Sequence, residues 1–187
     1  MPSDAFVTRF KQKYDSEDVI ERRGGFLPVG RSTAFAKKWH QIVEAPGMPP
    51  RSAAVVVLTG QRNRNLNDLG CCQRGTKGRQ SFGVIFLDDP DPASMKHVET
   101  DILRFHLPKH FTPAFTKQVW DAYLAKVFLH ELGHANFYEA HGGKGTVARH
   151  EQAAEKLAWA TLSKRFDREV VLATYSLFWL LAAINDD

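Results

Sequence analysis

Residues 112–143 read TPAFTKQVWDAYLAKVFLHELGHANFYEAHGG, and this stretch decides the fold of the chain. Thr112 is suited to cap a helix, and Pro113 suits the first helical position, where an N–H has no partner inside the helix. No further proline follows before the paired glycines at 142 and 143, which are typical of a helix end. Apolar residues recur at helical spacing, namely Val119, Trp120, Tyr123, Val127, Phe128 and Phe137. We therefore predict one long helix from Pro113 to about His141.

The predicted helix carries the motif HELGH at residues 130–134. His130 and His134 are four residues apart, so on a helix they lie about 6 Å apart along the axis and on nearly the same side. Both imidazoles can then bind one metal ion, while Glu131 holds a water molecule beside it. This HExxH pattern predicts zinc ligands at His130 and His134 and a general base at Glu131, whereas the simpler alternative is a surface helix with two solvated histidines. Gly133 costs about 1 kcal/mol relative to alanine, which we interpret as room for another backbone to approach.

A zinc site of this kind needs a third protein ligand, and the sequence after the motif excludes two arrangements. A metzincin would have a glycine and a histidine where Phe137 and Ala140 stand, and an aspartate-type site would have an aspartate in place of Arg149. His141 lies about 10 Å along the helix from His134, too far to share a metal ion. Glutamates on the following segment are the remaining candidates.

A second helix is predicted from Thr146 to Phe166, with an apolar stripe at Val147, Ala154, Leu157, Ala158 and Leu162. Glu151 and Glu155 are four residues apart on one face of it, so one can bind the metal while the other orients a ligating histidine. We place Glu151 ahead of Glu155 as the ligand, with a solvated pair of glutamates as the alternative. The short, glycine-rich connection favours a tight reversal that packs the two helices antiparallel.

HELGH followed by EQAAEKLA at residues 151–158 resembles the gluzincin-type zinc peptidases, in particular the small ImmA/IrrE-like peptidases. More distantly, the HExxH helix is similar to that of the SprT-like proteases. The likeness covers about Tyr123 to Ser163. It implies zinc held by His130, His134 and Glu151, with Glu131 as the base. It also implies a zincin-like α+β fold, in which a small mixed or antiparallel sheet packs on the active-site helix and the C-terminal helices.

Three protein ligands leave a fourth position for water, which zinc acidifies toward neutral pH. Glu131 would take the proton from this water and pass it to the leaving amine of a peptide bond. The oxyanion that develops needs a further hydrogen-bond donor. The candidates are Tyr138, His141, His150 and Tyr175, although each of them could equally be an ordinary surface or packing side chain.

Length and composition indicate a single domain spanning residues 1–187, because 187 residues that are 43% hydrophobic can bury one sizeable core. The only cysteines, Cys71 and Cys72, are adjacent and offer no disulfide framework. Residues 1–18 are charged throughout and contain no apolar signal-peptide core. We therefore expect a cytoplasmic protein.

Outside the motif region, helices are predicted at residues 4–22 and 32–44. Two short β-prone runs, residues 53–58 and 81–87, predict strands. Residues 96–107 fit a helix or a strand equally well. In HExxH peptidases a strand before the active-site helix pairs with extended substrate, so the resemblance implies that residues 84–87 form such an edge.

Residues 61–80 concentrate basic side chains, namely Arg62, Arg64, Arg74, Lys77 and Arg79, against the single acid Asp68. The whole chain carries a net charge of +4, with a pI of about 9.1. We interpret this segment as a glycine-loosened basic loop, either simply solvated or binding nucleic acid or an acidic protein partner. No aromatic residue is interleaved, which argues against base stacking.

Residues 169–184 are apolar around nearly the whole circumference of a helix, yet too few to cross a membrane. We expect a central packing helix, with an oligomer interface as the alternative and no membrane contact.

Two functions remain from the sequence. One is a zinc-dependent endopeptidase that cleaves a specific protein substrate, and the other is a non-enzymatic nucleic-acid- or protein-binding module on a zincin-like scaffold. Glu131 favours the enzyme, because a purely structural metal site needs no base.

Overall fold

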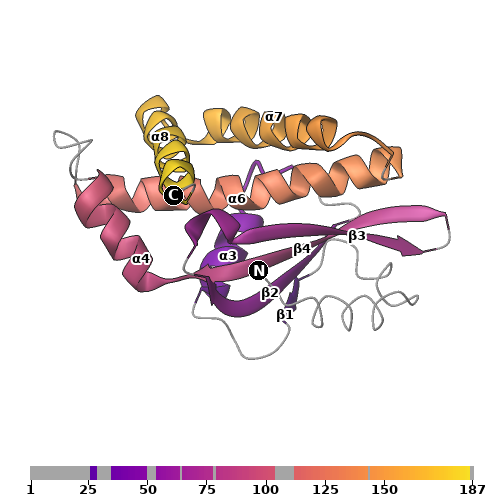
Figure 1. Cartoon of the computed structure of the whole chain (residues 1–187), viewed down its shortest axis with the longest axis horizontal. Helices are drawn as coiled ribbons and strands as arrows, with labels where there is room; N and C mark the ends of the chain where they lie inside the picture. Colours follow the sequence, from indigo (N-terminus) through magenta and orange to yellow (C-terminus); the bar gives the residue numbers. More distant parts are fainter. Residues whose placement is uncertain are drawn as a thin grey trace.

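The computed structural model describes residues 26–28, 35–49, 54–63, 65–77, 79–103, 112–142 and 144–185. These residues form an α+β structure in which one long central helix, α6, separates a mixed sheet from two further helices (Figure 1). The helix predicted at residues 4–22 lies outside the described part of the chain.

The described strands form a four-stranded sheet in the order β1-β2-β4-β3. They are β1 (Phe26–Pro28), β2 (Ala54–Asn63), β3 (Gly70–Lys77) and β4 (Gln80–Pro90). The pairs β1–β2 and β2–β4 are parallel, whereas β3 runs antiparallel to β4. The sheet is therefore mixed, and both predicted strands, at residues 53–58 and 81–87, are confirmed.

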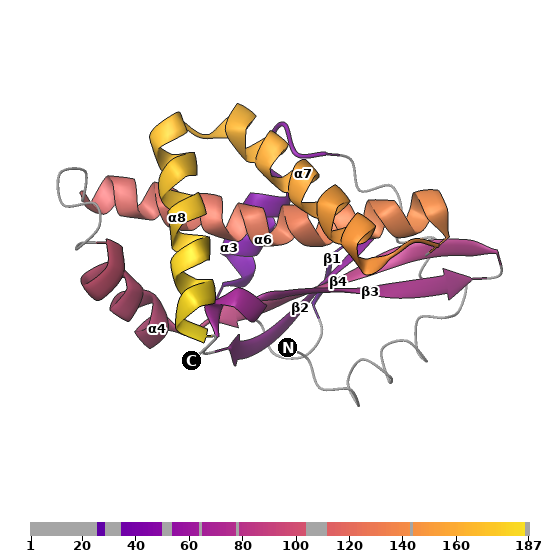
Figure 2. The same cartoon turned by 45° about the horizontal axis from the view of Figure 1, so that its top comes forward.

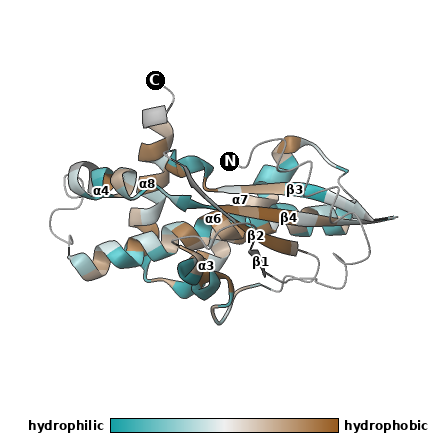
Figure 3. Ribbon diagram, turned by 90° about the horizontal axis from the view of Figure 1, so that it is seen from below, coloured by the Kyte–Doolittle hydropathy of each residue, from teal (hydrophilic) through white to brown (hydrophobic). Residues whose placement is uncertain are grey.

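Helix α6 (Pro113–His141) has the predicted bounds. The Thr112 hydroxyl accepts a hydrogen bond from the backbone N–H of Phe115 at 3.1 Å, and Gly142 ends the helix with φ of 59°. One side of α6 packs on β3 and β4, and the strongly hydrophobic residues of the sheet lie on β2 and β4 (Figure 3). The core formed there includes Val56, Ile85, Leu87, Phe128 and Leu132.

Helix α7 (Val147–Arg165) returns alongside α6 on the side away from the sheet, and α8 (Arg168–Asn185) crosses α6 near its middle (Figure 2). The second predicted helix is thus confirmed, with Ala154, Ala158 and Leu162 buried against α6. Val147, which was expected to belong to the apolar stripe, is 78% exposed because it begins the helix beyond the contact region.

The remaining helices are shorter and lie near the sheet and the start of α6. They are α3 (Ala36–Val43), the 3-10 turn η1 (Leu66–Asp68), α4 (Pro92–His97) and its π-helical continuation η2 (Val98–Leu103). Residues 96–103 are therefore helical, which decides between the two predicted alternatives for this part of the chain. Trp39 of α3 is fully buried and extends the core beneath α6.

Two predictions about the sheet are wrong. Residues 84–87 do not form an edge, because β4 pairs with β2 on one side and with β3 on the other. The basic segment 61–80 is not a loop, because it contains the end of β2, the turn η1 and the whole of β3. At Gly70 and Gly75, neighbouring side chains pack closely against the backbone. A Cβ at Gly75 would lie 2.4 Å from the ring of Phe82, and one at Gly70 would lie 2.7 Å from Val127 of α6. The side chains of Arg62, Arg64 and Lys77 lie outside the described part, so the nucleic-acid interface stays a prediction.

The prediction that residues 169–184 are buried all round is wrong for one face of α8. Val170, Ala173 and Leu177 pack into the core, as expected of a C-terminal packing helix. Leu172, Tyr175 and Trp179 are instead 54%, 46% and 63% exposed. Sequence composition did not distinguish these faces, since both are apolar. No helix that the structure describes has the length and apolarity needed to cross a membrane.

Candidate metal centre

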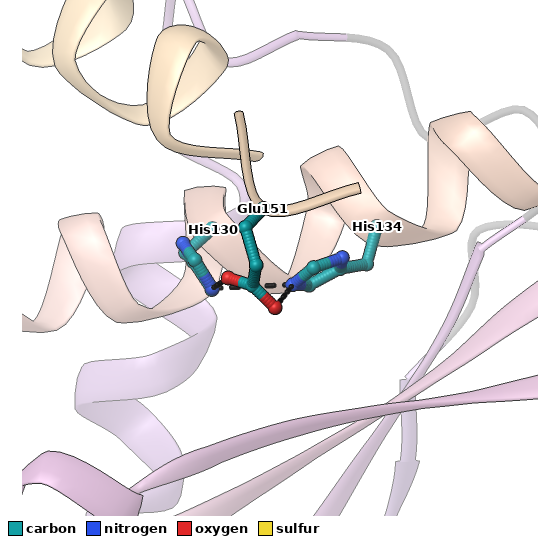
Figure 4. A group of neighbouring side chains, drawn as sticks. All are labelled: His130, His134 and Glu151. Carbon is teal, nitrogen blue, oxygen red and sulfur yellow. Dashed lines mark hydrogen bonds and ion pairs between the residues drawn. The ribbon is translucent and has the colours of Figure 1, made fainter. Parts of the chain in front are cut away.

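Two imidazoles of α6 and one carboxylate of α7 converge on a single point (Figure 4). The Nε2 atoms of His130 and His134 lie 3.2 Å apart. One carboxylate oxygen of Glu151 lies 3.4 Å from Nε2 of His130, and the other lies 3.5 Å from Nε2 of His134. One ligand atom from each residue therefore lies within 4.8 Å of the other two, and the predicted third ligand, Glu151, lies beside both histidines.

The close packing of α6 on α7 brings Glu151 to the histidines. A Cβ built on Gly133 would lie only 2.5 Å from the Cα of Ala154, a distance that real carbon contacts do not reach. Gly133 therefore lets the backbone of α7 approach α6 one turn away from Glu151. This is the role that the sequence suggested for a glycine within the motif.

Glu155 lies on the far side of His130 and is held by several donors. Its carboxylate accepts hydrogen bonds from Lys126 Nζ at 2.7 Å and from Trp159 Nε1 at 2.6 Å. One oxygen also lies 2.9 Å from Nδ1 of His130, although the N–H direction is not aligned for a hydrogen bond. Burial alone would raise the pKa of Glu155, but His130 and Lys126 together lower it to about 2. Glu155 is thus an anion at neutral pH whose carboxylate lies beside Nδ1 of His130, the position expected for the second glutamate.

Lys126 and Trp159 belong to this arrangement, and the sequence analysis did not identify them. Lys126 is 8% exposed and lies one turn before His130 on α6. Trp159 lies one turn after Glu155 on α7. Both spacings are visible in the sequence as i and i+4 pairs, so they were available as signals.

Glu131 points toward the sheet and is almost completely buried between α6 and the first residues of β3. It is 8% exposed, and its Cγ would lie 2.9 Å from a Cβ at Gly70. Desolvation raises the pKa of Glu131 to about 7, with Glu151 adding to the rise, while His130, Lys126 and the backbone of Cys72 act in the opposite direction. A carboxylic acid with a pKa near neutrality can both accept and release a proton, which suits a general base.

The four predicted oxyanion donors occupy different places. The ring centroid of His150 lies 6.4 Å from that of His134 and 5.3 Å from that of Tyr138. Tyr138 lies one turn after His134, and burial raises the pKa of its hydroxyl, as do the charges of Cys72 and Glu131. The hydroxyl therefore stays protonated within electrostatic range of the site, as a donor must. The ring centroids of His141 and Phe137 lie 4.4 Å apart. Helix α6 extends to His141, two turns beyond His134, so His141 is too far along the helix to share a metal ion with His134, as expected.

Tyr175 belongs to a pocket of about 690 Å³ that opens beside His130 and Glu131. Residues of five elements line it, including Asn67 of η1, Gly70 of β3, Val127 of α6, Trp159 of α7 and Tyr175 of α8. A substrate in this pocket would contact the candidate base directly.

The donor set fits a zinc ion. Two imidazoles and one carboxylate with an open fourth position are typical of catalytic zinc sites. Burial lowers the pKa of His134, an effect that His130 strengthens and Glu151 opposes, so the neutral imidazole that a metal requires is favoured. Neither Nδ1 atom of the two histidines has a hydrogen-bond partner among the described residues. The two Nε2 atoms and the Glu151 carboxylate face one another, and a cation between them could bind all three groups.

In comparisons with known proteins, no family model, no curated protein and no solved structure matches the chain. Function must therefore be inferred from the chemistry of the site rather than from relatives.

Proposed function

We propose that this protein is a zinc-dependent endopeptidase with a zincin-like active site that hydrolyses peptide bonds in a specific protein substrate. One observation carries the proposal. A buried carboxyl group, Glu131, lies next to a cluster of two imidazoles and a carboxylate that could hold a metal ion. A structural metal site needs the cluster but has no use for the base.

The ion would be held by His130, His134 and Glu151, and when bound it would supply a Lewis acid that polarises a carbonyl and acidifies water. Glu155 keeps the ring of His130 oriented from behind. Glu131 accepts the proton of the attacking water on its carboxylate and delivers it to the nitrogen of the leaving amine. The hydroxyl of Tyr138 is a candidate donor for the developing oxyanion, because Tyr138 lies one turn after His134 on α6 and its hydroxyl stays protonated.

The position of β3 supports an extended peptide as the substrate. Among the described strands β3 is an edge, and its first residue, Gly70, touches Glu131. A peptide that adds to this edge would pass directly beneath the base and the ligands. By the resemblance noted above, this is the role that the sequence analysis assigned to β4, and β3 takes its place.

The Glu131→Gln substitution tests the proposal, because it preserves the shape of the side chain and removes its basicity. We expect proteolysis of a proteome-derived protein mixture to fall by about 10²- to 10⁴-fold, with zinc content unchanged. The matched control is Glu139→Gln, an exposed glutamate two turns further along α6, which should leave both unchanged. Wild-type cleavage by the Glu131→Gln protein would refute the proposed function.

A further inference from the structure

The pocket beside Glu131 has an aromatic wall that the metal chemistry does not require. Trp159 of α7 and Tyr175, Phe178 and Trp179 of α8 form it. The ring centroids of Trp159 lie 5.3 Å from Tyr175 and 6.2 Å from Phe178, and Tyr175 lies 6.1 Å from Trp179. The four rings thus form one continuous surface that reaches from α7 to the exposed face of α8.

This wall carries no unpaired charge. Lys126 is the one lysine or arginine among the described residues that line the pocket, and its Nζ is bonded to Glu155 at 2.7 Å and lies 4.2 Å from the ring centroid of Phe178. The ammonium is therefore satisfied by a carboxylate on one side and an aromatic face on the other. The Glu155 carboxylate is in turn already bonded to Lys126 and Trp159, so the aromatic wall itself offers a charged group little compensation for lost hydration, whereas it would favour an apolar group.

Exposure of the wall also indicates a ligand. Tyr175 and Trp179 are 46% and 63% exposed, although both rings lie next to a pocket that could bury them. Exposed aromatic residues grouped in this way mark binding sites more often than folding requirements. The pocket of about 690 Å³ is larger than one side chain, so it has room for a bulky side chain and part of the adjoining backbone.

We infer that this aromatic pocket binds a bulky apolar side chain, such as that of phenylalanine, leucine or methionine, next to the peptide bond that is cleaved. The inference rests on the proposed function. It follows from the joint lining of the pocket by His130 and Glu131, by Gly70 at the start of β3, and by the aromatic wall. A peptide lying along β3 would present its backbone to Glu131 and one side chain to α8.

Cleavage-site profiling of a proteome-derived peptide mixture by mass spectrometry tests this inference. For the wild-type protein loaded with zinc, we expect bulky apolar residues to be enriched about 10-fold or more at one position beside the cleaved bond. Trp179→Ala should lower this enrichment several-fold. The matched control is Leu172→Ala, since Leu172 is 54% exposed on the same face of α8, two turns earlier, and does not line the pocket.

A second variant and a second readout extend the test, and the second readout, peptide binding, does not depend on turnover. Ala182→Phe places a ring in the pocket and should shift the preference toward small residues. Calorimetry with the Glu131→Gln protein should show tighter binding of acetyl-Ala-Ala-Phe-Ala-Ala-amide than of the peptide with alanine in the central position, by about 10-fold. Thermal denaturation checks that each variant is folded.

The outcomes separate the pocket from the proposed function. Cleavage without any side-chain preference, or equal effects of Trp179→Ala and Leu172→Ala, overturns the pocket and leaves the enzyme intact. A binding preference for the phenylalanine peptide without cleavage supports the pocket and contradicts the enzyme. Concentration-dependent dimerisation that Trp179→Ala and Leu172→Ala both abolish would show that this face of α8 binds a second copy, and would also overturn the inference.

Discussion

Replacing Gly133 with alanine tests how closely the two ligand-bearing helices must approach. The added Cβ would lie 2.5 Å from the Cα of Ala154, whereas ordinary carbon contacts begin near 3.4 Å. The helices must therefore separate by about 0.9 Å, the difference between these distances. Overpacking of this kind costs about 1–3 kcal/mol, and the higher helix propensity of alanine returns about 1 kcal/mol. We expect a net loss of about 1 kcal/mol in the free energy of unfolding of the metal-free protein.

The same displacement should weaken metal binding, because Glu151 lies one turn from Ala154 on α7. Zinc–ligand distances tolerate deviations of about 0.2 Å, so a shift of about 0.9 Å moves the carboxylate out of coordination range. Zinc affinity should fall at least 10-fold, the lower end of the effect seen when groups that position metal ligands are removed. Competition with a chelator measures the affinity, and urea unfolding measures the stability.

Gly142→Ala is the control for a glycine substitution that affects stability alone. Gly142 has φ of 59° at the end of α6, with no atom within 4 Å of an added Cβ. Alanine there costs about 1 kcal/mol through backbone strain and should leave zinc affinity unchanged. If Gly133→Ala bound zinc as tightly as the wild type and were more stable, the close approach of α6 and α7 would not be what positions Glu151.

Two further predictions follow from the glutamates. Glu155→Gln should reduce zinc affinity by about 10- to 100-fold, because it removes only the carboxylate beside His130. Glu151→Gln should reduce zinc affinity further, because it removes a ligand. The opposite order in a chelator competition assay would assign the ligand to Glu155. In the metal-free protein, burial raises the pKa of Glu131 from 4.5 to about 7, so the folded state holds this proton more tightly than the unfolded chain. The contribution of this proton to the free energy of unfolding is therefore fully present below about pH 4.5 and is lost as the pH rises toward 7. Over this range the free energy of unfolding should fall by about 3 kcal/mol more in the wild type than in Glu131→Gln. Urea unfolding across this range in the presence of a chelator measures the difference, and parallel curves for the two proteins would show that Glu131 is not protonated in the fold.

The helices of the site were predictable because their signals are local. Thr112, Pro113 and Gly142 mark the limits of α6, and the four-residue spacing of His130 and His134 places both on one face without reference to the rest of the chain. The short connection to α7 then restricts where Glu151 can lie. Sequence spacing therefore predicted the residues that the structure brings together.

The strand β3 could not be predicted in the same way. Gly70–Lys77 has no alternation of apolar and polar residues, so its strand conformation depends on pairing with β4 and packing beneath α6. Gly70 and Gly75, which indicate flexibility in a loop, are sites of close contact here. Strand pairing and tertiary packing of this kind override local propensity.

The aromatic pocket was also invisible in the sequence. Trp159 and the apolar residues of α8 gave the expected helical pattern, but a helix that is apolar on all sides does not indicate which side is covered. Only the crossing of α8 over α6 decides that Leu177 is buried and Trp179 is 63% exposed. The side chains that would select a substrate are therefore set by tertiary packing.

The central claim is that His130, His134 and Glu151 hold one zinc ion beside Glu131. A crystal structure of the zinc-loaded protein, with anomalous data collected at the zinc absorption edge, measures this directly. We predict one anomalous peak, with Nε2 of each histidine at about 2.0–2.1 Å and a Glu151 oxygen at about 2.0–2.2 Å. A structure with no zinc at these residues, or with zinc held elsewhere in the chain, would contradict the claim.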